Sequence, residues 1–267
     1  MKNYVAKQKQ ILKEQIVEYG LKPVLAIVQV GDNPASNSYV KGKLKDCEEL
    51  GIECRHIKLD ENITQYTLDD KVLELSYDLD VSGIIVQLPV PKHLVVKDFF
   101  VESGKDVDGF RYDSPYRPCT PLGISMFLKD KGVDFKGKNV AVIGRSEIVG
   151  KPMAKIMIEE DATVTVCHSK TKDISMYTKM ADIIIVAVGK RNFLTRDMIG
   201  DTRPIVIDVG INRNEEGKLC GDCDYENLLD VCEYVSPVPN GVGLLTRLAL
   251  MTNVVKSAMR KVEDVNE

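Results

Sequence analysis

Tyr39 and Lys43 are the side chains in the amino-terminal half whose types and spacing best suit chemistry. Their segment carries apolar residues at helical spacing, and this stripe consists of Val40, Leu44 and Cys47. Residues four apart are neighbours on a helix, so Tyr39 and Lys43 share one face. Lys43 falls at the edge of the stripe, where a lysine can be partly desolvated and can serve in proton transfer. The alternative is an amphipathic lysine that only covers apolar surface.

A second candidate site is the loop that runs from Gly144 to Gly150, after an apolar strand and before a helix. Backbone N–H groups and the helix dipole favour an anion at such a place, so the loop predicts a phosphate site. The spacing is not the Gly-x-Gly-x-x-Gly of the common dinucleotide fingerprint. The alternative is a turn that needs glycine only for its backbone angles.

The next strand bears on the choice between NAD and NADP. It ends at residues 167–170, Cys-His-Ser-Lys, and has no acidic residue of the kind that binds the ribose 2′-hydroxyl of NAD. Arg145, Ser169 and Lys170 could instead bind a 2′-phosphate. We therefore expect NADP, with solvated surface charges as the alternative for the two cations.

Alternating helices and strands must position these residues. In the first region we expect helices at about 9–19, 34–50 and 67–79, and strands at 23–30, 54–59 and 83–89. Asn33 should cap the second helix and Gly51 should end it. In the second region a helix near 122–129 precedes strands at 139–143, 163–167, 182–188 and 205–209, and a last helix covers about 244–262. The pattern predicts an α/β protein with two doubly wound parallel units, in which sites lie at the carboxyl ends of strands.

Bulk composition limits the classes of function. The chain has 267 residues and a net charge of -4, which disfavours nucleic acid as the main partner. Its seven cysteines are scattered and odd in number, which is typical of reduced thiols in the cytoplasm. The first residues show no signal or transit pattern, and no apolar run is long enough to cross a membrane. We expect a soluble, cytoplasmic protein.

Nine segments together resemble the bifunctional methylenetetrahydrofolate dehydrogenase/cyclohydrolases along nearly the whole chain. These segments are residues 30–36, 39–43, 86–91, 105–109, 118–121, 144–150, 167–171, 206–212 and 237–243. The resemblance implies that 5,10-methylenetetrahydrofolate is oxidised with NADP and that the methenyl product is hydrolysed to 10-formyltetrahydrofolate. It also implies a homodimer and a cleft between a folate-binding catalytic domain, 1–119 plus the helix 245–267, and a Rossmann-like NADP domain, 120–244.

The resemblance assigns roles to individual residues. Lys43 would be the catalytic lysine, Tyr39 would place the folate, Gln87 would hold Lys43, and Asp108 would bind the pterin. The alternative for Asp108 is that it is only a turn residue, since Asp-Gly pairs are common in turns. Further substrate contacts are expected from Leu88, Pro237 and Gly241. The NADP contacts are expected from Gly144, Arg145, Ser146, Ile148, Val149, Gly150, His168, Ser169 and Ile211.

The chain departs from the family's pattern in three places. The segment 110–117 is short, Asn240 replaces a usual glycine, and Leu244-Leu245-Thr246 replaces Pro-Met-Thr. Asparagine tolerates left-handed backbone angles, so we expect the turn at Asn240 to survive.

The spacing of Cys220 and Cys223 fits half of a zinc site, but no second pair follows, and we expect no metal. The remaining alternatives to the folate enzyme are an NADP dehydrogenase of another small metabolite and a catalytically silent nucleotide-binding or scaffold protein.

Overall fold

The computed structural model describes residues 1–266, and the chain folds into two compact units. One unit comprises Asn3–Cys119 together with the chain from Arg247 onwards, and we call it the lysine unit because it holds Lys43. The other comprises Thr120–Thr246 with the first two residues, and we call it the glycine-loop unit. None of the helices in the described part of the chain has the length and apolarity needed to span a membrane.

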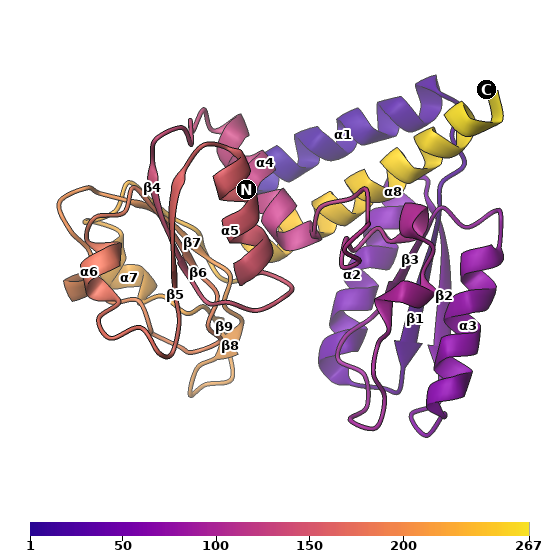
Figure 1. The fold of residues 1–267 in the computed structure, drawn as a ribbon, viewed down its shortest axis with the longest axis horizontal. Helices are drawn as coiled ribbons and strands as arrows, with labels where there is room; N and C mark the ends of the chain where they lie inside the picture. Colours follow the sequence, from indigo (N-terminus) through magenta and orange to yellow (C-terminus); the bar gives the residue numbers. More distant parts are fainter. Residues whose placement is uncertain (267) are drawn as a thin grey trace. The chain divides into compact units, whose positions relative to one another are not determined.

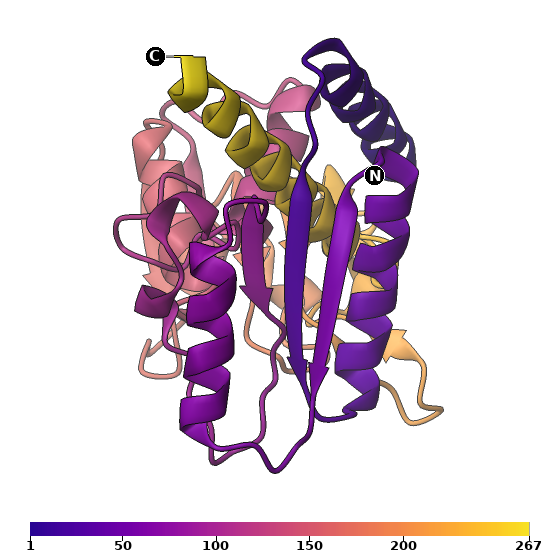
Figure 2. The same ribbon diagram turned by 90° about the vertical axis from the view of Figure 1, so that its right-hand side faces the viewer.

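The lysine unit is built on a three-stranded parallel sheet with the order β2-β1-β3. Its strands are β1 (Val24–Val30), β2 (Glu53–Leu59) and β3 (Gly83–Val86). Every residue of the central strand β1 is buried, whereas β2 lies at an edge and is half exposed. Helices α2 (Pro34–Leu50) and α3 (Gln65–Tyr77) flank the sheet on opposite sides (Figure 2). The short 3-10 helices η1 (Asp98–Phe100) and η2 (Ser103–Lys105) follow β3.

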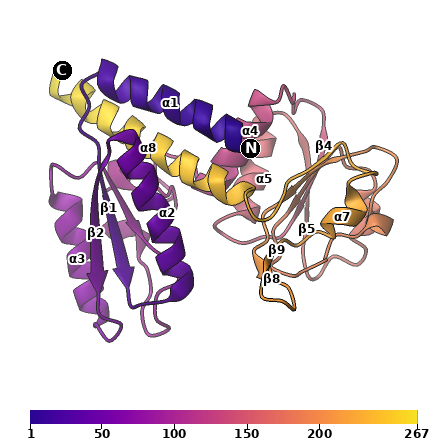
Figure 3. The same cartoon turned by 180° about the vertical axis from the view of Figure 1, so that it is seen from behind.

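Two longer helices complete the lysine unit. Helix α1 (Lys2–Glu18) and most of α8 (Val242–Asn266) belong to it, and they run next to each other in Figure 1 and Figure 3. Helix α1 begins earlier than the sequence pattern predicts, because Tyr4 and Val5 are buried and extend its apolar stripe. On α8, Met251, Val254 and Val255 are at most 1% exposed, so this helix is an integral part of the core.

Local signals set the limits of α2, the helix that carries Lys43. The Asn33 side chain accepts hydrogen bonds from the backbone N–H groups of Ala35 and Ser36, and Pro34 follows it. This satisfies N–H groups that the first turn of a helix leaves free. Gly51 ends the helix in the left-handed conformation, with φ of 74°. Both predicted limits are confirmed.

The glycine-loop unit contains a five-stranded parallel sheet with the order β10-β7-β6-β4-β5. Its strands are β4 (Asn139–Ile143), β5 (Thr163–Cys167), β6 (Ile183–Val186), β7 (Ile205–Asp208) and β10 (Tyr234–Val235). Its helices are α4 (Cys119–Asp130), α5 (Gly150–Glu159), the short α6 (Ser175–Thr178), η3 (Arg196–Met198) and α7 (Tyr225–Leu228). A small hairpin joins β8 (Asn212–Arg213) to β9 (Leu219–Cys220).

The predicted α/β fold with two parallel, doubly wound units is confirmed, and four strands of the second sheet lie where the pattern placed them. Strand β10, the hairpin and the one-turn helices are absent from the predicted elements. They have two to four residues each, too few to show a period. The predicted strand at 83–89 is shorter, because the chain turns away after Val86 towards a cis Leu88–Pro89 bond.

Candidate active site

The lysine unit brings Lys43 and Gln87 into direct contact. Lys43 Nζ donates a hydrogen bond of 3.0 Å to Gln87 Oε1. The Gln87 amide has a fixed orientation, because its Nε2 donates to the carbonyl oxygen of Leu88 at 2.6 Å. Only the oxygen of this amide can therefore face the lysine. Gln87 is buried and Lys43 is half-buried, so the hydrogen bond lies partly out of water.

Tyr39 and Leu88 border this contact in the chain and are more open. Tyr39 lies one turn before Lys43 on α2 and is 40% exposed, and Leu88 is 41% exposed. Burial raises the pKa of the Tyr39 phenol, which keeps it a neutral group that can both donate and accept. An exposed aromatic ring and an exposed leucine beside a held lysine can contact a flat organic ligand.

The loop that carries Asp108 is held by its neighbours. Lys105 is buried, and its ammonium donates to the backbone carbonyls of Ser76 and Asp78 at the end of α3, both at 2.7 Å. Asp106 accepts from the backbone N–H of Gly109 at 3.1 Å and from that of Arg111 at 2.8 Å. These contacts make Lys105 and Asp106 structural, because both hold the loop that carries Asp108.

Helix α8 supports the same loop from the other end of the chain. The Asn253 side chain is 1% exposed and donates to the carbonyl oxygens of Val107 at 2.9 Å and Arg117 at 3.2 Å. Gly109 has φ of 73°, and a Cβ there would lie 2.6 Å from the carbonyl carbon of Arg117. The Asp-Gly pair therefore marks a tight crossing of two chain segments.

Asp108 has a perturbed acidity. Burial raises the pKa of its carboxyl to about 6, and the charges of Asp106 and Asp98 also raise it. The Lys43 ammonium and a hydrogen bond with Cys119 act in the opposite direction. Lys43 and Asp108 are thus close enough to interact electrostatically. A half-buried carboxylate whose pKa is raised in this way is typical of a ligand-binding position.

The loop from Gly144 to Gly150 joins β4 to α5 and has little spare room. Gly144 has φ of 122°, and a Cβ there would lie 2.2 Å from the Ala187 carbonyl oxygen. A Cβ on Gly150 would lie 2.3 Å from the Gly144 carbonyl oxygen. Ser146 Oγ accepts from the N–H groups of Val149 and Gly150 at 3.2 and 3.3 Å. Close backbone approach therefore requires glycine at both positions.

The side chains around this loop are open. Arg145, Ser146 and Ile148 are exposed, and Val149 is half-buried. At the end of β5, Ser169 is exposed and His168 is half-buried. The His168 ring is oriented by the Lys170 N–H, which donates to its Nδ1 at 3.2 Å. The end of β5 presents a hydroxyl and an imidazole, and Ile211, which follows β7, is also exposed.

Two buried carboxylates that the sequence pattern does not single out hold the ends of β6 and β7. Asp222 is fully buried and accepts from the backbone N–H groups of Val188 and Gly189 at 2.7 and 2.9 Å, and from Asn212 Nδ2 at 2.8 Å. Asp208 accepts from three further backbone N–H groups, those of Gly210, Asp222 and Cys223. Together they fix the loops that leave the two strands. The sequence signals these two carboxylates only through nearby glycines. A Cβ on Gly210 would clash with the Asp222 carboxylate, and a Cβ on Gly221 would clash with that of Asp208.

The segment after β10 holds Pro237 and Gly241, which lie in the glycine-loop unit. Val238–Pro239 is a cis peptide bond, and Asn240 adopts φ of 70°. The predicted left-handed turn at Asn240 is confirmed. Gly241 is buried, and a Cβ on it would lie 2.0 Å from the Pro237 carbonyl oxygen.

Cys223 packs as a buried thiol beside Asp208. Burial raises its pKa far above the usual range, and the Asp208 charge adds to this. A thiol held protonated is a poor metal ligand and a poor nucleophile. In residues 1–266, no cluster of three or more His, Cys, Asp or Glu side chains is arranged to hold a metal ion.

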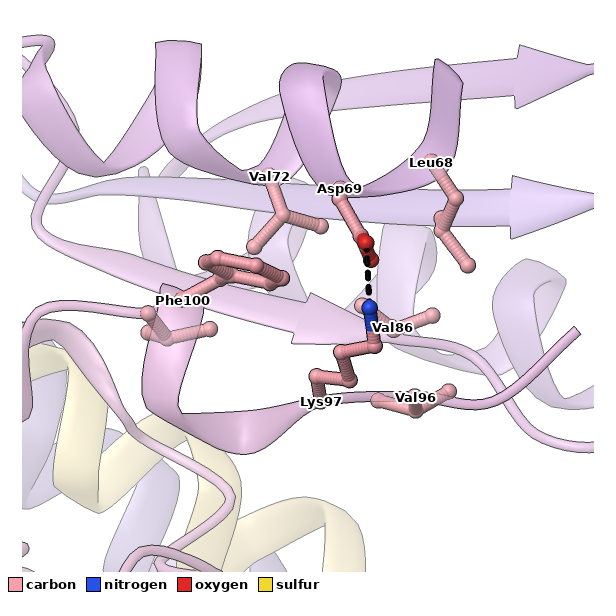
Figure 4. A pocket seen from close by; sticks show the side chains of 8 residues that line it. Leu68, Asp69, Val72, Val86, Val96, Lys97 and Phe100 are labelled. Carbon is pink, nitrogen blue, oxygen red and sulfur yellow. Dashed lines mark hydrogen bonds and ion pairs between the residues drawn. The ribbon is translucent and has the colours of Figure 1, made fainter. Parts of the chain in front are cut away.

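A small hollow near α3 is unsuited to a folate or a nucleotide. It is lined by residues of α3, β3 and the segment 96–101, and its volume of about 10 Å³ suits a single water molecule (Figure 4). The Lys97–Asp69 ion pair, at 2.7 Å, crosses it, and Lys97 also lies 5.3 Å from the centre of the Phe100 ring. We interpret it as a packing gap under an ion pair.

Comparison with known families agrees with this geometry. Residues 1–108 match the tetrahydrofolate dehydrogenase/cyclohydrolase catalytic domain, and residues 118–262 match the NAD(P)-binding domain of the same family. The chain belongs to the tetrahydrofolate dehydrogenase/cyclohydrolase family. The resemblance drawn from the nine segments is therefore confirmed.

Individual relatives of this family cover almost the full chain. The bifunctional protein FolD of Bacillus mycoides is 48% identical over 97% of this chain and 95% of its own length. The crystal structure of the bifunctional FolD enzyme of Campylobacter jejuni has a TM-score of 0.93 and 46% identity, covering 97% of each chain. The Trypanosoma brucei FolD structure, complexed with NADP and an inhibitor, has a TM-score of 0.90 and 29% identity, covering 97% of this chain and 96% of its own.

Proposed function

We propose that this protein oxidises 5,10-methylenetetrahydrofolate to the 5,10-methenyl compound with NADP and then hydrolyses the product to 10-formyltetrahydrofolate. The observation that carries the proposal is the 3.0 Å hydrogen bond between Lys43 and Gln87. The Lys43 charge also acts on the carboxyl of Asp108 and lowers its pKa. A proton-handling amine, an amide that orients it and a carboxylate that recognises a heterocycle are the groups this chemistry needs.

The glycine-loop unit fits NADP. The tight loop Gly144–Gly150 leads into the amino terminus of α5, where the helix dipole favours a phosphate. The exposed Arg145 and Ser169 can bind a 2′-phosphate, and the end of β5 presents no acid that would repel one. Ser146, Ile148, Val149, Gly150, His168 and Ile211 would contact the rest of the molecule. When bound, NADP supplies the hydride acceptor.

The lysine unit places the folate and moves protons. Asp108 accepts hydrogen bonds from the amino and ring nitrogens of the pterin, while Tyr39 and Leu88 contact its flat rings. In the hydrolytic step a water molecule attacks the methenyl carbon and loses one proton by exchange with Lys43. The bond between this carbon and N5 of the folate then breaks as the hydroxyl proton leaves and N5 takes up a proton, which gives the 10-formyl compound and one released proton. Gln87 holds the amine in place throughout the step. We assign further substrate contacts to Pro237 and Gly241.

A spectrophotometric assay tests the proposal directly. With 5,10-methylenetetrahydrofolate, we expect reduced cofactor to form with NADP faster than with NAD, and little methenyl compound to accumulate. Equal rates with the two cofactors would contradict the roles of Arg145 and Ser169. No reduction with either, together with no hydrolysis of added methenyltetrahydrofolate, would overturn the function itself.

Substitution of Lys43 by alanine separates the two activities. We expect hydrolysis to fall by about a hundredfold or more, in line with loss of a proton-transfer group, with the oxidation partly retained. Lys45→Ala is the matched control, because Lys45 lies on the same helix and is exposed. Equal hydrolysis by the two variants would remove Lys43 from the mechanism.

The domain roles, assembly and compartment are further proposals. We assign folate binding and catalysis to residues 1–119 and 245–267, and NADP binding to 120–244. We also propose a homodimer, supported by the half-exposed strand β5 at the edge of its sheet, which offers unpaired backbone groups to a second copy. The seven free cysteines support a reducing compartment, the cytoplasm. Light scattering on the purified protein measures the assembly.

A further inference from the structure

Arg247 lies on α8, in the part of this helix that belongs to the lysine unit, and its guanidinium rests on α2. A Cβ on Gly42 would come within 2.1 Å of Arg247 Nη1 and 3.2 Å of its Cζ. Because Gly42 has no side chain, the guanidinium can lie on the helix backbone. Gly42 directly precedes Lys43, so the arginine reaches the level of the catalytic lysine.

The helix geometry of α2 defines where this cation lies. Gly42 and Asp46 are four residues apart and form one row on the helix surface, and Tyr39 and Lys43 form another. The two rows are adjacent, since Tyr39 precedes Gly42 by three residues and Lys43 precedes Asp46 by three. Arg247 follows the first row: its Nη1 lies at Gly42, and its Nε lies 3.2 Å from Asp46 Oδ2.

Asp46 does not need Arg247 as its main partner. The buried Asp46 accepts a 2.7 Å hydrogen bond from Lys9, which also bonds Glu49 at 2.6 Å. Asp46 Oδ2 accepts no hydrogen bond in the described structure, so its contact with Arg247 is electrostatic only. A guanidinium has five N–H donors in a planar fork, and a quarter of the Arg247 side chain is exposed to solvent. The fork can therefore receive an anion from outside.

Arg247 lies on the same helix that supports the loop of Asp108. Asn253 holds the loop of Asp108, the proposed pterin-binding residue, and Arg247 lies six residues earlier, about 9 Å along the helix axis. A tetrahydrofolate carries its pterin at one end and a glutamate with free carboxylates at the other. A planar guanidinium fork matches a carboxylate in a bidentate way.

We propose that Arg247 binds a carboxylate of the glutamate moiety of the folate and sets the preference of the enzyme for substrates with that anionic tail. This inference rests on the proposed function. It assigns Arg247 a contact with substrate atoms remote from the reacting carbon, so its removal affects substrate affinity more than the chemical step.

Hydrolysis of two substrates by the full-length enzyme tests the proposal. One is 5,10-methenyltetrahydrofolate and the other is 5,10-methenyltetrahydropteroate, which lacks the glutamate. In Arg247→Gln we expect KM for the folate to rise about tenfold, the loss of one charge-assisted contact, with kcat within about twofold and KM for the pteroate unchanged. Arg247→Lys, which keeps the charge without the fork, should recover part of the affinity for the folate.

This test has a matched control, and specific outcomes would overturn the inference. Lys45→Gln removes one positive charge from an exposed position on α2 and should leave both KM values unchanged. An equal loss with both substrates in Arg247→Gln would show that Arg247 only supports α2 and would overturn the inference, as would no loss with either. If the unaltered enzyme hydrolyses neither substrate, the proposed function itself fails, which is a different result.

Discussion

The ionised carboxylate of Asp108 lowers the stability of the folded state. Its carboxyl has an ordinary pKa of 3.8 and a pKa of about 6 in the folded chain, mainly because it is buried. Between these two values the folded chain holds the proton more tightly than the unfolded chain does. Raising the pH through this window therefore lowers the free energy of unfolding, by at most about 3 kcal/mol at 1.36 kcal/mol per pKa unit.

We predict that Asp108→Asn stabilises the protein above pH 7 by about 1–3 kcal/mol and has little effect near pH 3.5. The same change removes the proposed acceptor for the pterin, so we expect activity to be lost while stability is gained. Urea unfolding at the two pH values measures the first effect. A variant that is less stable than the parent at pH 7.5 would contradict the assignment of a strained, functional carboxylate.

The ionisation of Asp108 also predicts a pH dependence of catalysis. In the proposed mechanism the carboxylate form of Asp108 binds the pterin, so kcat/KM should fall as the pH drops below about 6 in the free enzyme. The profile of Asp108→Asn should be low and lack this limb. A parent profile that stays flat from pH 5 to 7.5 would mean that another group recognises the pterin.

At the scale of the element, glycines at positive φ differ in what surrounds them. Gly109 and Gly51 have φ of 73° and 74°, but a Cβ on Gly109 would strike Arg117 and Pro118, whereas nothing lies within 4 Å of one on Gly51. We predict that Gly51→Ala costs about 1 kcal/mol, the backbone term, and that Gly109→Ala costs about 2–4 kcal/mol. Gly109→Ala should also lower activity, because its loop carries Asp108. Chemical denaturation of the two variants measures the difference in the free energy of unfolding. Equal losses of stability would show that the backbone at Arg117 moves aside without cost when residue 109 carries a Cβ.

The loops after β6 and β7 depend on Asp222. Removal of its carboxylate leaves the N–H groups of Val188 and Gly189 and the Asn212 amide without their acceptor in a buried place. We predict that Asp222→Ala destabilises the protein by about 3–5 kcal/mol and raises KM for NADP. Hydrolysis of methenyltetrahydrofolate, assayed under conditions where the variant is folded, should change much less. A variant that loses both activities in parallel would assign Asp222 a purely global role.

The sequence revealed those elements and residues whose signal is local. Asn33 and Gly51 limit α2 through contacts with their own helix, and the strand Val24–Val30 is apolar at nearly every position because helices cover both faces. The sequence did not predict the structural roles of Asp222 and Asn253, because their partners Gly189 and Val107 lie 33 and 146 residues away in the chain. The sequence did not predict the position of Arg247 for the same reason, because its neighbour Gly42 lies on α2, far from α8 in the chain.

At the scale of the whole molecule, the two units differ in how the chain forms them. The glycine-loop unit is nearly one continuous stretch, Thr120–Thr246, with its own sheet and a core cluster in which Ile143, Ile184 and Val206 are fully buried. The lysine unit needs both ends of the chain. Its core includes Met251 and Val254 of α8, and Asn253 holds the Asp108 loop.

This difference predicts unequal independence of the two units. Residues 120–246 expressed alone should fold cooperatively and bind NADP, since a unit with its own core can fold by itself. Residues 3–119 alone should fail to fold, because the surfaces that α8 covers would be exposed to water. Joining residues 247–266 to 3–119 through a flexible linker should restore the fold and is the matched control. Thermal unfolding by circular dichroism and NADP titration by calorimetry measure these outcomes. Cooperative unfolding of residues 3–119 without α8 would show that this unit folds without the helix and would contradict the prediction.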